Sequence, residues 1–219
     1  MEDKYIEDLS NNNLFLNISI ENLKHLLPCL NATTKNFEKN NIIFHQGNKI
    51  NKIGIILEGS LLIEKVDFWG NNTILKTLTK NNIFGEIYAF ENHPLEISIK
   101  ASTNCKILFL NFNKIMHPCK IACNFHTTLI INLLQIFAKK AIYMNKKIDI
   151  LSNRTIEEKL LTYLKTLSIQ KKSKTFEIPY NRQELADFLV VNRSALSKEL
   201  MKLKKLGILN YNKNIFTLQ

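Results

Sequence analysis

The side chains best suited to chemistry in this chain of 219 residues lie in one segment, NRQELADFLVVNRSALSKEL, at residues 181–200. Four polar side chains there recur at i, i+1, i+4 and i+5, so a helix beginning near residue 193 carries all of them on one face. They are Arg193, Ser194, Ser197 and Lys198. Such side chains can donate hydrogen bonds to base edges and phosphates in a DNA major groove. The spacing therefore predicts a helix that reads DNA.

Apolar spacing in the same segment predicts two short helices around a tight turn. Leucines in the second helix fall at i, i+4 and i+7, the spacing of one buried face. The first helix, over residues 182–189, has a similar stripe. The expected buried residues are Leu185, Ala186 and Leu189 in the first helix and Leu196, Leu200 and Leu203 in the second. Taken alone, the segment also allows an ordinary helical hairpin with a charged outer face.

Capping residues support the same two helices. Asn181 and Glu184 have the spacing of a capping box, and Asn192 can cap the second helix. The turn between the helices contains Val190, where helix-turn-helix turns often have glycine. Because a β-branched residue resists positive φ, we expect this turn to differ slightly from the usual one.

The distribution of charge favours a polyanionic partner. The chain has 30 basic and 19 acidic residues, a formal net charge of +11. Residues 153–219 contain 13 basic and 6 acidic residues, a net charge of +7, and the preceding 152 residues contain 17 and 13, a net charge of +4. The basic excess therefore coincides with the predicted helix pair.

Targeting signals are not expected. The first ten residues are acidic and lack an apolar core, so they do not resemble a secretory signal. Residues 121–138 contain no charged side chain, but Asn124, His126 and Asn132 are among the polar residues that interrupt them. A lipid-spanning helix would tolerate these poorly, so we interpret the segment as a buried or dimer-facing helix and expect no membrane association.

The first half of the chain has the pattern of a β-roll. Five of the six glycines lie between Gly47 and Gly85, and short apolar runs alternate with Gly or Asn-Asn turns about every ten residues. This spacing predicts an antiparallel, jelly-roll-like sheet structure. Gly70, Asn71 and Asn72 are a candidate hairpin turn.

From about residue 122 to residue 151 the pattern becomes helical. Seven apolar residues follow at spacings of 4, 3, 4, 3, 4 and 3, an unbroken heptad that predicts a coiled-coil seam. A single core helix of period 3.6 would drift off this repeat. A second stripe, Leu129, Leu133 and Ile136, is expected to face the roll. The seam residues, expected to form a dimer interface, are Ile130, Leu134, Phe137, Ala141, Met144, Ile148 and Leu151.

The last third of the chain has the pattern of a winged helix. Thr155 and Glu158 form a second capping box before another helix, and residues 175–179 predict a short strand. Residues 208–218 predict a terminal hairpin. The expected fold is α+β, with a sensor β-roll and short N-terminal helices at 1–112, a dimerisation helix region at 113–152 and a winged helix-turn-helix domain at 153–219.

This order of elements resembles the Crp/Fnr family of bacterial transcription regulators over about residues 35–219. The matching motifs are the Gly47 turn, Glu58-Gly59-Ser60 at a strand end, Phe84-Gly85-Glu86 opening a ligand cassette, and the helix pair. The resemblance implies a cytoplasmic homodimer that binds double-stranded DNA at a palindromic operator. It also makes RNA polymerase a candidate partner.

The resemblance also implies roles for individual residues. Arg193 matches an arginine that suits a guanine edge or a phosphate. Ser194 stands where many members have a glutamate that reads cytosine, so the half-site cannot be copied from them. Ser197 and Lys198 match the other reading positions, Arg182 and Gln183 sit where relatives contact the DNA backbone, and Lys202 is expected to add positive charge.

The ligand cassette departs from the members that bind cyclic AMP. Those members clamp the cyclic phosphate with an Arg-Ser or Arg-Thr pair, and this chain has Leu95 and Glu96 there. A carboxylate repels a phosphate, and no guanidinium replaces the missing one. We therefore expect no response to cyclic AMP and an effector that is unknown or absent. The expected effector pocket comprises Phe84, Gly85, Glu86, Leu95 and Glu96.

Two alternatives from other classes stay open. His117, Cys119, Cys123 and His126 lie within ten residues and would suit a metal- or redox-sensing regulator. Pro118 disturbs that helix, so reduced, inert thiols in the cytosol are favoured, with no metal and no cofactor. The other alternative is a ligand-binding signalling module with a protein partner. The chain shows no phosphate-binding glycine loop, nucleophile elbow or catalytic carboxylate pair, so we do not expect an enzyme.

Overall fold

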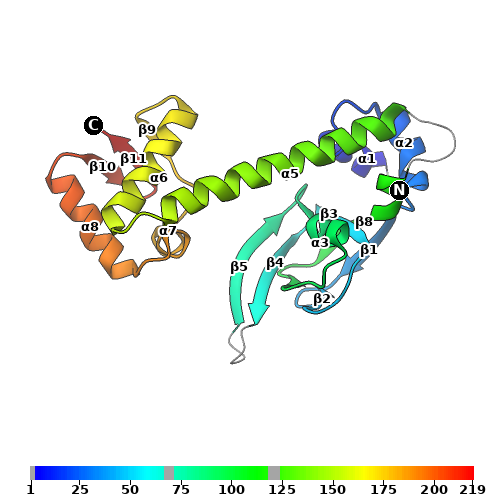
Figure 1. The fold of residues 1–219 in the computed structure, drawn as a ribbon, viewed down its shortest axis with the longest axis horizontal. Helices are drawn as coiled ribbons and strands as arrows, with labels where there is room; N and C mark the ends of the chain where they lie inside the picture. Colours follow the sequence, from blue (N-terminus) through cyan, green and yellow to red (C-terminus); the bar gives the residue numbers. More distant parts are fainter. Residues whose placement is uncertain (1–2, 67–71, 118–123) are drawn as a thin grey trace. The chain divides into compact units, whose positions relative to one another are not determined.

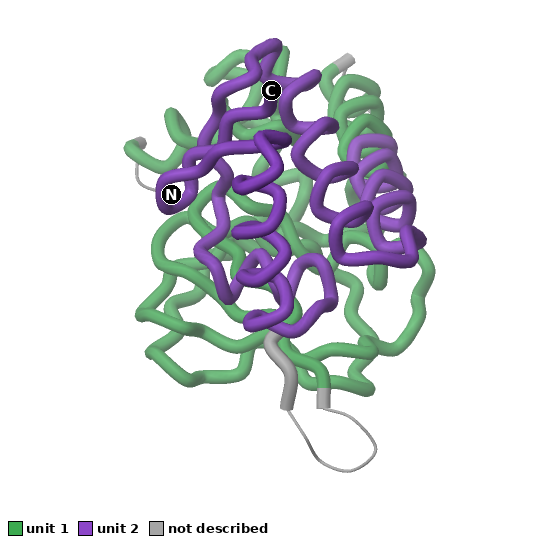
Figure 2. Tube along the Cα trace, turned by 90° about the vertical axis from the view of Figure 1, so that its left-hand side faces the viewer, with its two compact units in different colours: residues 1–137 green, residues 138–219 purple. Residues whose placement is uncertain are grey.

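The computed structural model describes residues 3–66, 72–117 and 124–219. The chain forms two compact units, residues 1–137 and residues 138–219, shown in green and purple in Figure 2. The boundary falls within one long helix, α5, which runs from Asn124 to Leu151. The division into three segments at residues 112 and 152 stays a prediction.

Unit 1 is built on two antiparallel four-stranded sheets (Figure 1). The first has the order β1-β8-β3-β6 and comprises Thr33–Phe37, Cys105–Asn111, Lys52–Glu58 and Ile83–Phe84. The second has the order β2-β7-β4-β5 and comprises Ile42–Phe44, Ser98–Ala101, Ser60–Val66 and Asn72–Thr79. Buried side chains from both sheets, such as Ile107 and Leu61, share one core cluster, so the sheets pack face to face as a roll. The predicted roll is confirmed.

The turns of the roll depend on small residues at defined positions. Gly59 joins β3 to β4 with φ of 84°, and a Cβ there would lie 2.4 Å from the carbonyl oxygen of Asn104. Only glycine fits this close approach at a positive φ. The predicted turn at residues 70–72 lies largely outside the described residues, although β4 and β5 pair from Ser60 and Thr79 to Val66 and Asn72.

A second core cluster joins the sheets to four helices of unit 1 and to α5. The helices are α1 (Asp3–Ser10), α2 (Ile20–Cys29), α3 (Glu86–Glu91) and α4 (Phe112–Met116). Leu129, Leu133 and Ile136 of α5 are buried in this cluster, as their stripe predicts. The buried Asn132 on the same helix donates hydrogen bonds to the carbonyl oxygens of Leu14 and Leu16, at 3.0 and 2.8 Å. These hydrogen bonds hold the segment between α1 and α2 against α5.

Unit 2 contains the predicted winged helix. Its elements after α5 are α6 (Ile156–Lys171), β9 (Thr175–Glu177), α7 (Arg182–Leu189), α8 (Arg193–Lys205), β10 (Leu209–Asn212) and β11 (Ile215–Leu218). The strands form one antiparallel sheet in the order β10-β11-β9. Both predicted capping boxes are present, and the Asn192 side chain accepts hydrogen bonds at the start of α8. All six predicted core residues of the helix pair are fully buried.

The turn between α7 and α8 corrects one expectation. Val190 ends α7 with φ of 54° and ψ of 55°, the left-handed conformation that glycine usually takes. The amide of Val190 donates to the carbonyl of Asp187 and the amide of Val191 to that of Ala186, the pattern of a Schellman cap. The usual turn is therefore kept, because these cap hydrogen bonds hold a β-branched residue at a positive φ.

We predict that Val190→Gly stabilises the protein by about 1 kcal/mol. The substitution relieves a left-handed conformation that costs an L-residue about 1–2 kcal/mol, partly offset by the extra freedom of glycine in the unfolded chain. Little packing is lost, because the Val190 side chain is 68% exposed. Urea unfolding of the full chain measures the change. As a control, Val191→Gly should destabilise, since Val191 packs against the core of unit 2; a lower midpoint for Val190→Gly would contradict the prediction.

Among the described residues, no helix has the length and apolar character needed to cross a membrane.

Candidate nucleic-acid interface

Helix α8 presents a basic face opposite a buried one. Leu196, Leu200 and Leu203 have no exposed surface, and Arg193 and Lys198 are exposed. Neither cation makes a hydrogen bond or ion pair with the part of the chain that the structure describes. Both charges are therefore available to a ligand.

The two serines of the same face are held by local hydrogen bonds. The hydroxyl of Ser194 donates to Asn192 Oδ1 at 2.6 Å, and that of Ser197 donates to the carbonyl of Arg193 at 3.0 Å. Each hydroxyl oxygen can still accept a hydrogen bond from a base. The Asn192 oxygen also accepts from the amide of Ser194 at 2.9 Å, which fixes the first turn of α8. That turn is the part of a recognition helix that contacts base edges.

Lys202 is engaged within unit 2. Its Nζ lies 2.8 Å from Glu157 Oε2 on α6 and 2.9 Å from Glu199 Oε1 on α8. The hydrogen bond to Glu157, followed by that to Glu199, raises the pKa of Lys202, and the hydrogen bond from Lys202 lowers the pKa of Glu157. The role of Lys202 at DNA stays a prediction, and a phosphate would have to compete with both carboxylates for it.

Arg182 and Gln183, at the start of α7, are also engaged. The Arg182 guanidinium carbon lies 4.9 Å from the centre of the Tyr211 ring, and Nη2 donates to the carbonyl of Lys213 at 3.4 Å. Burial lowers the pKa of Arg182. Gln183 Nε2 donates to Asp187 Oδ1 at 2.8 Å. Arg182 thus ties α7 to the β10–β11 hairpin, an arrangement that local sequence patterns did not indicate.

The tip of that hairpin carries a lysine that is not among the site residues predicted from the sequence. Lys213 is exposed and has φ of 53°, in a turn between Asn212 and Asn214. An open groove of about 940 Å³ lies beside it and is lined in part by Arg182, Lys213 and the ring of Phe216. The Asn-Lys-Asn sequence was the available signal, because asparagines favour such turns.

The predicted effector cassette is assembled only in part. Gly85 starts α3 with φ of 81°, and the Glu86 carboxylate that follows is 2% exposed. Leu95 is a core residue, whose amide and carbonyl pair with Asn48 and Gly47. Phe84 is likewise buried, with its ring edge-on to those of Phe44 and Phe109.

Glu96 has a different environment from Glu86. Glu96 is exposed. Burial of the Tyr88 side chain is the main cause that raises the pKa of Tyr88, and the nearby Glu96 carboxylate raises it further. Of the five predicted pocket residues, Gly85 and Glu86 are adjacent at the start of α3, whereas Phe84 and Leu95 serve the core.

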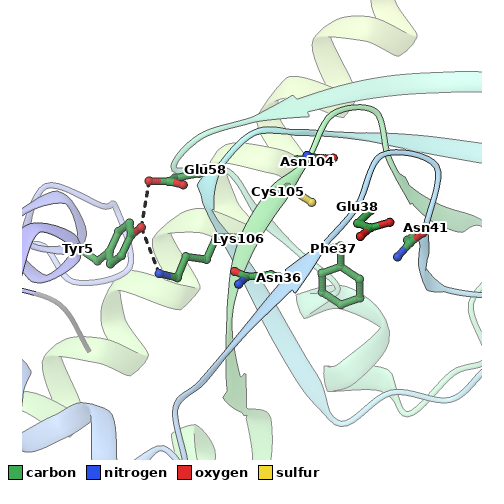
Figure 3. A pocket seen from close by; sticks show the side chains of 9 residues that line it. All are labelled: Tyr5, Asn36, Phe37, Glu38, Asn41, Glu58, Asn104, Cys105 and Lys106. Carbon is green, nitrogen blue, oxygen red and sulfur yellow. Dashed lines mark hydrogen bonds between the residues drawn. The ribbon is translucent and has the colours of Figure 1, made fainter.

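A separate groove of about 570 Å³ is lined by side chains of α1, of β1, β3 and β8 and of the loops next to these strands (Figure 3). The Tyr5 hydroxyl donates to Glu58 Oε1 at 2.9 Å and accepts from Lys106 Nζ at 3.2 Å. The Tyr5 hydrogen bond is the main cause that lowers the pKa of Glu58. Glu58 is therefore used to hold α1 in place.

The cysteine-rich segment is described only in part. Cys119 and Cys123 lie outside the described residues, so their predicted inertness stays a prediction. His117 is exposed, and His126 is 2% exposed with no hydrogen bond to either ring nitrogen from the described residues. Burial raises the pKa of the Cys105 thiol. No cluster of three His, Cys, Asp or Glu side chains suits a metal within residues 3–66, 72–117 and 124–219.

The predicted seam of α5 is uncovered in the single chain. Leu134, Met144 and Ile148 are 60%, 54% and 57% exposed. Phe137 is half-buried, and its ring centre lies 5.9 Å from that of Phe90 on α3. Ile130 and Leu151 are also half-buried, and Ala141 is exposed.

A roll, a long helix and a winged helix-turn-helix with an exposed basic face define a DNA-binding transcription regulator. Residues 34–119 match the family model of the cyclic nucleotide-binding domain, and residues 158–219 match that of the Crp-like helix-turn-helix domain. Together the two matches cover about two thirds of the chain. The chain belongs to the Crp/Fnr family of transcription regulators.

Individual relatives agree with this assignment. A protein of Porphyra purpurea named "Putative HTH-type transcriptional regulator ycf28" is 26% identical over 171 residues, covering 76% of this chain and 69% of its own length. Three solved structures share the fold. The first is the Thermus thermophilus catabolite activator protein, with a TM-score of 0.56 and 18% sequence identity, covering 95% of this chain and 94% of the other. The second is OCPA-complexed CprK, with a TM-score of 0.68 and 15% identity, covering 90% of this chain and 91% of the other. The third is the c-di-GMP responsive regulator CLP of Xanthomonas campestris, with a TM-score of 0.60 and 16% identity, covering 91% of this chain and 99% of the other.

Proposed function

We propose that this regulator is a homodimer whose paired α8 helices read a palindromic operator, and that its effector is not a cyclic nucleotide. The observation that carries the first part is the exposed face of α8. Arg193 and Lys198 are exposed, while the leucines behind them are fully buried. A helix held by its apolar stripe can enter a major groove without rearranging its domain.

Exposed apolar surface on α5 supports the dimer. Leu134, Met144 and Ile148 are each more than half exposed and follow the heptad spacing of a two-helix seam. Apolar residues gathered on one face of a helix indicate a partner surface. A second copy of the chain offers the same stripe, and a two-fold pair of reading helices matches a palindromic operator.

The chemistry of the cassette supports an effector other than cyclic AMP or cyclic GMP. The resemblance aligns Leu95 with the usual arginine and Glu96 with the residue after it, and in this chain Leu95 is buried in the core and Glu96 is exposed. The start of α3, with Gly85 and Glu86, is retained. The fold of a cyclic nucleotide-binding domain is thus compatible with a changed ligand. RNA polymerase is a further candidate partner.

We predict that Arg193→Ala costs about 1–3 kcal/mol of binding to the specific operator and little on random DNA. The operator is first selected from a random DNA library with the unaltered protein. Affinity is then measured on both DNAs by gel shift at several salt concentrations, since phosphate contacts make binding salt-dependent. As a control, Lys205→Ala removes an exposed cation from the last turn of α8 and should weaken both complexes slightly and equally. Equal losses for Arg193→Ala would place Arg193 on a phosphate; a protein that selects no sequence would contradict the proposed function.

We predict that Met144→Glu converts the dimer to a monomer at low micromolar concentration. A carboxylate placed in an apolar seam costs several kcal/mol when it is buried unpaired. Sedimentation measures the change, with Lys146→Glu on the opposite side of α5 as a control that stays dimeric. Phe137→Glu should also split the dimer, but Phe137 additionally contacts Phe90 within unit 1. A dimeric Met144→Glu variant would remove this part of α5 from the interface.

We predict that cyclic AMP and cyclic GMP do not bind at millimolar concentration. Loss of a bidentate arginine contact, with a carboxylate in its neighbourhood, should cost more than about 4 kcal/mol, which moves a micromolar site beyond the millimolar range. Calorimetry on the purified protein tests this, with a family member that has the Arg-Ser pair as the positive control. Saturable heat with a micromolar constant would show that another basic side chain, such as the half-buried Lys100, reaches the phosphate.

A further inference from the structure

Three aromatic rings of unit 2 form a cluster behind the helix pair. It comprises Tyr163 on α6, Tyr180 just before α7 and Phe188 near the end of α7. The ring centres of Tyr180 and Phe188 are 5.0 Å apart in a stacked arrangement, and those of Tyr163 and Phe188 are also 5.0 Å apart. Tyr163 and Tyr180 lie 6.2 Å apart. The cluster therefore joins both ends of α7 to α6.

Two side chains from the C-terminal half of α5 contact this cluster. Lys147 Nζ lies 5.3 Å from the centre of the Phe188 ring, within the range of a cation–π interaction. The Tyr143 side chain neighbours that of Tyr180 closely enough to raise the pKa of the Tyr180 hydroxyl. Burial, followed by the effect of the neighbouring Tyr143, raises the pKa of Tyr180 to about 12, so the Tyr180 hydroxyl stays protonated at neutral pH.

These contacts define one face of α5. Tyr143 and Lys147 are followed by Ile150, which is buried in the core of unit 2, and the three lie at i, i+4 and i+7. They share one side of the helix. The seam residues of the same segment, Met144 and Ile148, follow a different stripe and are exposed. A single helical segment thus contacts its own helix-turn-helix on one side and carries the seam on another.

We propose that Tyr143 and Lys147 are positioning residues, which fix the orientation of α7 and α8 relative to the dimer seam and thereby set the half-site spacing that the dimer binds. This inference rests on the proposed function, because spacing has meaning only for a dimer on a palindrome. One added base pair moves a half-site by about 3.4 Å and rotates it by about a tenth of a turn. Small changes in the angle between α5 and the helix pair are therefore measurable as a change in preferred spacing.

We expect the same contacts to have little effect on folding. Tyr143 is 49% exposed and Lys147 is half-buried, and the Leu160, Leu164 and Leu200 side chains of the core behind them have no exposed surface. Removing the Tyr143 hydroxyl or the Lys147 charge leaves that core intact. The effect is expected on DNA geometry, which a purely structural role would not change.

The test compares the unaltered protein with the Tyr143→Phe/Lys147→Met double variant, both as full chains. Lys146→Met is the matched control, since Lys146 is an exposed lysine of the same helix. Three DNAs are used: the palindrome selected by the unaltered protein, the same palindrome with one base pair added to its centre, and a single half-site. Affinities are measured by gel shift, and thermal unfolding confirms that the variants are folded.

We expect the double variant to bind the selected palindrome about tenfold more weakly, and its preference over the altered palindrome to fall at least threefold. Its affinity for the single half-site should stay within twofold of that of the unaltered protein, and Lys146→Met should change none of these values. An unchanged spacing preference, or equal losses on the half-site and the palindrome, would overturn the positioning role. A failure of the unaltered protein to select any DNA would overturn the proposed function itself, a result distinguishable from either.

Discussion

The burial of three leucines of α8 is the constraint on which the candidate interface depends. Because Leu196, Leu200 and Leu203 have no exposed surface, the rotation of α8 about its own axis is fixed. Arg193 and Lys198 must then point away from the domain. Asn192 fixes the start of the helix along its axis through its cap hydrogen bonds. Rotation and start together decide which side chains of α8 are presented to a ligand, so the proposed recognition of bases depends on the apolar core as well as on the surface.

Both units have the fold of the family, but they differ in how closely their candidate sites match the motifs expected from it. Unit 2 retains a complete helix-turn-helix, including a glycine-like turn made by Val190 at a positive φ. Unit 1 has the roll and the Gly85-Glu86 start of α3, and the two residues predicted to stand in place of a phosphate clamp are a buried leucine, Leu95, and an exposed glutamate, Glu96. Strand pairing and core packing do not depend on the ligand, so the roll can persist while the pocket changes.

The sequence predicted what short-range patterns encode. Capping boxes at Thr155 and Asn181, the leucine stripe of α8 and the order of the elements are all confirmed, because each depends on spacings of two to seven residues. The engagement of Lys202 by Glu157 and of Arg182 by Tyr211 was not predicted, since these partners are 45 and 29 positions away in the sequence. The Val190 turn was misjudged because intrinsic φ preference was weighed without the cap hydrogen bonds that oppose it.

The hydrogen bonds from Asn132 to Leu14 and Leu16 bear on where the packed core around the roll begins and ends along the chain. The matched cyclic nucleotide-binding domain covers residues 34–119, yet the core of unit 1 includes Leu9, Phe15 and Leu23 before it and Leu129 and Leu133 after it. A fragment cut at the family boundaries would expose this apolar surface and leave roll residues without their partners. The matched family module and the packed core of unit 1 therefore span different lengths of chain, and the N-terminal part of α5 completes that core.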